Sequence, residues 1–195
     1  MKRLAILLAF FVTTSFGIGI QGVFGGNIGL WKYWDYGLGK GGHIGLLVNF
    51  EEKPFSNPLS LGLESGFLLQ NSDYWWRDLY DNPLLEIYLD NLVIPTLAKV
   101  SFDLSKKVTL GFGAGPLVII HTSGRWTNTG TWEPFERSYL QPDIGLQFKG
   151  DIGIKLFSVI WLKPALAFQM NSTLTDDIIN AEDMLMLSLG LECKF

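Results

Sequence analysis

The C-terminal stretch Met184–Phe195, MLMLSLGLECKF, alternates between two kinds of residue. Every second position from Leu185 to Phe195 carries an apolar side chain. The positions between them include serine, glycine, glutamate and lysine. Successive side chains of a β-strand point to opposite faces of the sheet. The stretch therefore predicts an amphipathic strand with one apolar face, ending the chain on an aromatic residue.

The same period of two recurs along the chain after its first residues, and no run is long enough for a membrane-spanning helix. It predicts strands at 18–29, 42–51, 58–70, 88–104, 108–121, 141–156, 159–170 and 184–195. The connections alternate between long and short, with short turns after the second, fourth and sixth strands. Even strand number and alternating loop length are typical of outer-membrane barrels, which places both chain ends on the short-turn side.

The charged residues of these strands decide which face of the sheet points inward. One face is almost purely Leu, Ile, Val and Phe, while the other carries a set of charged side chains. A small soluble barrel would have to bury those charges or leave the apolar face in water, and unpaired buried charges cost several kcal/mol each. With the apolar face toward lipid, the sheet must close on itself, because hydrocarbon tolerates no open strand edge. The expected lumen network is Glu64, Lys99, Asp143, Lys149, Asp151, Lys155, Lys163 and Glu192.

The predicted fold is all-β: an eight-stranded antiparallel up-and-down transmembrane β-barrel. Eight strands leave an interior about wide enough for side chains, so we expect a lumen plugged by the charged network. A narrow pore for small solutes is the alternative.

The overall composition excludes several classes of protein. The chain has 195 residues, of which 48% are hydrophobic and 17% charged, which excludes an intrinsically disordered chain. A net charge of −4 argues against a nucleic-acid partner. One cysteine and two histidines leave no intramolecular disulfide and no structural zinc site, and we expect no cofactor or metal.

The N-terminus has the organisation of a secretory signal peptide. Lys2 and Arg3 precede an apolar run, Leu4–Val12, and small residues follow it, with a cut expected after Gly17. The sequence therefore predicts a signal peptide at 1–17 and one barrel domain at 18–195.

Three segments together resemble the small eight-stranded outer-membrane barrel proteins, the OmpX, OmpA-barrel and PorT-like group. They are LVIPTLAKV at Leu92–Val100, VTLGFGAGPLV at Val108–Val118 and the closing SLGLECKF. The resemblance implies a monomer in the outer membrane of a diderm bacterium, in contact with outer-membrane lipid. It also implies that the barrel-assembly machinery recognises the last strand through Leu191, Cys193 and Phe195. The group is functionally mixed, so the resemblance does not carry a function.

One short motif suggests an enzyme. His121 and Ser123 lie where a predicted strand ends, and this His-x-Ser pair resembles the catalytic pair of outer-membrane lipid A deacylases. Glu133 or Glu136 could orient the histidine. However, Gly124 and Arg125 follow the serine where that family has an asparagine. The alternative is a histidine at the membrane interface that begins a polar loop.

Aromatic side chains gather in the expected long loops: Tyr74, Trp75, Trp76, Trp126 and Trp132. They suit either an aromatic belt at the level of the lipid headgroups or a binding surface for a host or surface ligand. Our first hypothesis is a non-enzymatic barrel that acts through its external loops.

Overall fold

The computed structural model describes residues 16–31, 37–53, 58–77, 83–128, 130–136, 142–171 and 182–195. The predicted signal peptide lies outside the described residues except for Phe16 and Gly17, which begin the first strand. The described residues contain no helix of the length and apolarity that crossing a membrane requires.

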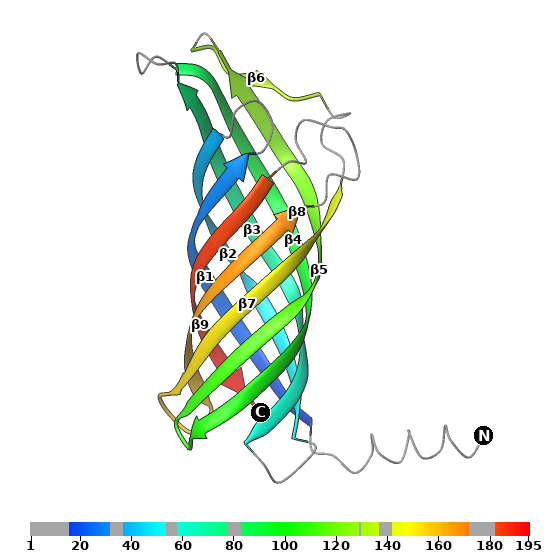
Figure 1. Ribbon diagram of the computed structural model, residues 1–195, viewed down its shortest axis with the longest axis vertical. Helices are drawn as coiled ribbons and strands as arrows, with labels where there is room; N and C mark the ends of the chain where they lie inside the picture. Colours follow the sequence, from blue (N-terminus) through cyan, green and yellow to red (C-terminus); the bar gives the residue numbers. More distant parts are fainter. Residues whose placement is uncertain are drawn as a thin grey trace, which may run out of the picture.

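The strands form one antiparallel sheet that closes into a barrel (Figure 1). In the sheet the order is β4-β3-β2-β1-β9-β8-β7-β5-β6, and pairing of β4 with β5 closes the ring. Eight long strands make the wall: β1 (Phe16–Trp31), β2 (Gly37–Glu52), β3 (Leu59–Arg77), β4 (Pro83–Ser105), β5 (Val108–Thr127), β7 (Asp143–Lys155), β8 (Ile160–Asn171) and β9 (Glu182–Lys194). The prediction of eight antiparallel strands in a closed barrel is confirmed.

The first and last strands of the chain's barrel are hydrogen-bonded neighbours. β1 pairs with β9 from Gly19↔Lys194 to Trp31↔Glu182. Beyond β9, the backbone of Phe195 exchanges two hydrogen bonds with Ile18, at 2.8 and 3.4 Å, and its side chain is 75% exposed. The terminal aromatic residue therefore continues the seam and points away from the lumen. Its role as an assembly signal stays a prediction.

The two faces of the wall have the predicted orientation. Phe24 is 55% and Ile44 62% exposed on the outside, whereas Gln21 and Lys163 are almost completely buried on the inside. Exposed apolar side chains occur on every long strand. An apolar surface of this extent marks a membrane-facing region.

The strands at the long-loop end extend further than the sequence pattern predicted. β3 continues to Arg77, β4 begins at Pro83 and β5 continues to Thr127, so that parts of the expected loops are strand. A two-residue strand, β6 (Glu133–Pro134), pairs with β5 at Arg125 and Trp126. The pattern missed these extensions because apolar residues recur at every second position only where one side of a strand faces lipid. Backbone pairing continues beyond that apolar band.

Candidate functional site

The predicted charged network exists at the short-turn half of the lumen. The Lys99 ammonium lies 2.8 Å from the Asp151 carboxylate and 3.4 Å from that of Glu64. Lys149 contacts the other oxygen of Glu64 at 2.5 Å. Lys163 lies 2.8 Å from Glu192 and 3.9 Å from Asp151. These three lysines and three acids are buried and come from five strands, so their charges cancel inside the wall.

Three side chains that were not in the predicted network, Asn49, Glu51 and Lys194, extend it toward the short turns. Lys194 contacts Glu51 at 2.7 Å and Glu192 at 3.7 Å. Asn49 donates a hydrogen bond to Glu192 at 2.7 Å. Asn49 and Glu51 share the inward alternation of His43 and Leu47, so the period of two could have identified them.

Two predicted members, Asp143 and Lys155, lie outside the network. Asp143 is buried at the long-loop end of β7, where its carboxylate accepts the backbone N–H of Ile144 at 2.7 Å. Lys155 is at the other end of β7, with its ammonium 5.8 Å from the ring of Trp161. Alternation assigned both to the correct face. Their position along β7 separates them from Lys149 and Asp151, which occupy its centre.

Between the charged network and the long-loop end of the lumen lies an apolar layer. The sequence pattern did not predict this layer. Nine buried side chains form one cluster: Val23, Leu47, Leu68, Val93, Leu117, Ile119, Ala167, Met184 and Met186. On β3, for example, the order toward the long loops is Glu64, Leu68 and then Gln70. The lumen therefore holds an ion network and, toward the long loops, a layer of packed hydrocarbon.

A β-bulge separates the two residues of the candidate catalytic pair. Asp90 pairs with Ser123 but Asn91 pairs with His121, so Thr122 is an extra residue that inverts the alternation. His121 is buried with its Nδ1 2.7 Å from Asn91 Oδ1, whereas exposed Ser123 donates to Asp90 at 2.6 Å. The structure thus places them on opposite faces of the wall and does not bring them together.

The candidate orienting acids are also distant from the histidine. Glu133 pairs with Trp126, five residues beyond His121 on β5, which corresponds to about 15 Å along a strand. Glu133 and Glu136 are both exposed. Within the described part of the chain, no three His, Cys, Asp or Glu side chains gather as a metal site would require.

The predicted aromatic binding loop is not a loop where the structure describes it. Tyr74, Trp75 and Trp76 belong to β3, and Tyr74 is completely buried in a small cluster with Ile87 and Leu89. Trp126 packs against this cluster. The side chain of Trp76 lies outside the described residues.

At the long-loop end of the barrel, called the upper end below, Trp132 and Trp75 each stack with a cation. The Arg125 guanidinium lies 4.9 Å from the ring of Trp132 and 4.7 Å from that of Tyr88. The Lys40 ammonium lies 5.2 Å from the ring of Trp75. Lys40, Asp73, Tyr88 and Arg125 follow one another across β2, β3, β4 and β5 in register. Paired strands therefore present Lys40, Trp75, Tyr88 and Arg125 beyond the apolar band, and Trp132 stacks on Arg125 from outside the strands.

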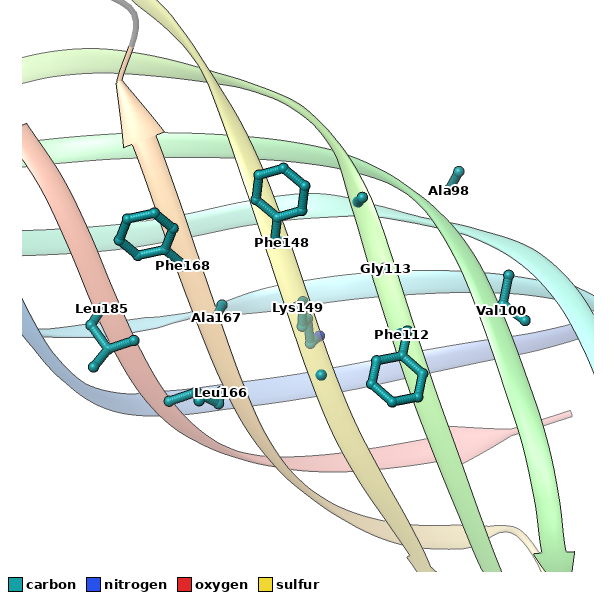
Figure 2. Close-up of a pocket in the computed structure, with 12 residues that line it drawn as sticks. Ala98, Val100, Phe112, Gly113, Phe148, Lys149, Leu166, Ala167, Phe168 and Leu185 are labelled. Carbon is teal, nitrogen blue, oxygen red and sulfur yellow. The ribbon is translucent and has the colours of Figure 1, made fainter.

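The outer wall also has a hollow within the apolar band. Figure 2 shows Phe112, Phe148 and Phe168 projecting from neighbouring strands β5, β7 and β8. A depression of about 560 Å³ lies among them, and Ala98, Ala114 and Gly150 line it. Its walls are apolar, which suits contact with lipid chains.

Comparison with known proteins identifies the architecture. The attachment invasion locus protein Ail of Yersinia pestis matches with a TM-score of 0.51 at 9% sequence identity, over 92% of this chain and 98% of Ail. The fold is that of a small closed β-barrel similar to Ail. Neisserial surface protein A matches this barrel with a TM-score of 0.49 at 16% identity, covering 93% of this chain and 99% of that protein. OprG from Pseudomonas aeruginosa gives 0.49 at 11% identity, covering 93% and 97%.

Sequence comparison adds no closer relative of the barrel. No protein-family model matches the chain, and no curated protein matches its sequence. At identities this low, the likeness to Ail concerns the fold alone.

Proposed function

We propose that this protein is an integral outer-membrane barrel that conducts no solute and acts through the surface it exposes beyond the membrane. The observation that carries the proposal is the filling of the lumen, in which a buried ion network and an apolar layer follow one another. The exposed apolar band and the fold shared with Ail support the location in the outer membrane.

The surface beyond the band has the residue types of a contact site. Arginine and aromatic residues are frequent anchors of protein interfaces. Here Arg125 stacks on Tyr88 and Trp132, and Lys40 on Trp75. All of these except Trp132 lie on paired strands, which need little ordering when a partner binds. The fold has a precedent for ligand binding, since Ail has been solved in complex with the heparin analogue sucrose octasulfate. A host protein or another surface ligand is the partner we propose.

Conductance in planar lipid bilayers tests the closed lumen. We expect no stable single-channel steps, because buried lysine–acid pairs and an apolar layer occupy the lumen where solute would have to pass. A wide general porin inserted in the same bilayers provides the positive control. Large, stable steps from the purified barrel would contradict the proposal and favour the narrow-pore alternative.

The deacylase alternative has a separate test, the Ser123→Ala variant. We expect the lipid A mass spectrum of cells producing this variant to equal that of cells producing the parent protein, because Ser123 bonds to Asp90 outside the wall while His121 faces the lumen. Cells lacking the protein are the reference. A deacylated species that requires the intact serine would contradict the non-enzymatic proposal.

A further inference from the structure

A second groove on the outer wall crosses the upper edge of the apolar band. It has a volume of about 790 Å³, and exposed Phe24, Ile44 and Leu69 line its apolar end. Asn71, Asp90 and Thr122 line its polar end. A hollow of about 450 Å³ continues upward, shares Gly42 and Asn71 with the groove, and is lined by Lys40, Asp73 and Tyr88.

The wall behind this groove has unusual pairing. The ladder between β2 and β3 runs from Lys40↔Asp73 directly to His43↔Gln70, without pairs at Gly41 and Gly42. The Asn71 side chain instead accepts the N–H of Gly42 at 2.6 Å. The Asn27 amide donates to the backbone carbonyl of Asn71 at 3.0 Å. The side-chain amides of Asn27 and Asn71 thus replace ladder hydrogen bonds behind the polar end of the groove.

Three residues whose side chains point inward form the back of the groove. His43, Gln70 and Asn91 are buried and line it from the lumen side. They face the lumen, where His43 Nε2 lies 2.9 Å from Ser188 Oγ, so a ligand in the groove would meet the outward-facing side chains.

The chemistry of the groove changes from one end to the other. The lower end offers hydrocarbon only. The polar end offers amides, a hydroxyl and carboxylates, which match the donors and acceptors of sugar hydroxyls. Tyr88 adds a ring against which an apolar sugar face can pack. The charges of Lys40, Asp73 and Asp90 are mixed in sign, which gives no preference for an anionic headgroup.

We propose that this groove binds a glycolipid, with one acyl chain along Phe24, Ile44 and Leu69 and its sugar at Asn71, Asp73 and Tyr88. The proposal rests on the membrane location inferred above. It deepens that function, because a bound glycolipid would fix the barrel's surface to the lipid around it.

The test uses the complete barrel in phosphatidylcholine nanodiscs, with backbone amide NMR signals as the readout. The probe is dodecyl-β-maltoside, which has one chain and a sugar head, titrated below its critical micelle concentration. Dodecylphosphocholine is the control for the chain. We expect saturable shifts at Gly42 and Asn71 with the maltoside and none that saturate with the phosphocholine.

Gly42→Leu and Gly22→Leu are the matched variants. A Cβ at Gly42 would meet the Gly25 carbonyl at 3.4 Å and Asn71 Oδ1 at 3.7 Å, so leucine fits the backbone but fills the groove. A Cβ at Gly22 would meet nothing within 4 Å, and Gly22 lies outside the groove. We expect at least a tenfold loss of maltoside affinity from Gly42→Leu and no change from Gly22→Leu.

Tyr88→Leu is a second variant at a partly exposed position, and we expect it to weaken maltoside binding while the barrel stays folded. Equal responses to both probes, or unchanged affinity in both the Gly42 and Tyr88 variants, would overturn the glycolipid proposal. Either result leaves the conductance measurement unaffected, so failure of the groove and failure of the closed-lumen function are distinguishable.

Discussion

Replacing Glu64 with leucine is expected to destabilise the barrel by roughly 3–5 kcal/mol, the range for breaking a buried ion pair from one side. Glu64 contacts both Lys149 at 2.5 Å and Lys99 at 3.4 Å, and its side chain is 1% exposed. Its removal leaves Lys149 without a carboxylate among the described residues and Lys99 with Asp151 alone. Equilibrium unfolding in urea, with the barrel in lipid vesicles, measures the change in free energy.

Two variants separate the network from a general effect of losing a charge. Asp103→Ala breaks the exposed pair with Lys53 at the barrel's end, and surface pairs contribute only about 0–1 kcal/mol. The double variant Glu64→Leu with Lys149→Met removes both partners, so we expect it to recover part of the lost stability. If Glu64→Leu were as stable as Asp103→Ala, the network would not support the fold as described.

Gly45→Ala is expected to prevent most of the protein from assembling. A Cβ on Gly45 would lie 2.1 Å from the backbone carbonyl oxygen of Phe67 and 2.8 Å from the Cα of Leu68. The obstacle is backbone of the neighbouring strand, so β2 and β3 would have to move apart along their ladder. We expect loss of the heat-modifiable band, which closed barrels show on SDS gels when samples are compared with and without boiling.

Gly22→Ala is the control, because its Cβ has open space on the outer face of β1. It should keep the mobility shift and the membrane location of the parent. A Gly45→Ala protein that assembles as well as Gly22→Ala would show that the wall at β2 and β3 is less tightly joined than the structure indicates.

The fold was largely predictable because lipid imposes a simple pattern. Each strand needs one apolar side, so alternation located all eight strands and assigned Lys99, Asp151 and Glu192 to the lumen. It was less predictable which of the inward-facing charged residues form ion pairs with one another. Asp143 and Lys155 have the correct alternation, but tilted strands bring together residues of similar height, and height depends on the register between neighbours.

The candidate catalytic pair shows the clearest limit of reading alternation alone. Two residues apart on a strand, His121 and Ser123 should share a face. The extra residue Thr122 inverts the alternation, so that one faces the lumen and the other the outside. The same inversion places Arg125 outward beside Tyr88 and Trp126 inward beside the Tyr74 cluster.

The sequence by itself determined the number of strands, the closed antiparallel wall, and which face of each strand points to lipid and which to the lumen. These features follow from the local period of two and from the cost of burying charge. The tertiary structure decided which lumen charges meet, where the bulge turns β5, and how far β3, β4 and β5 extend beyond the apolar band. Those features depend on pairing between distant segments. Cross-strand register is a relation between two strands, and the alternation within either one does not specify it.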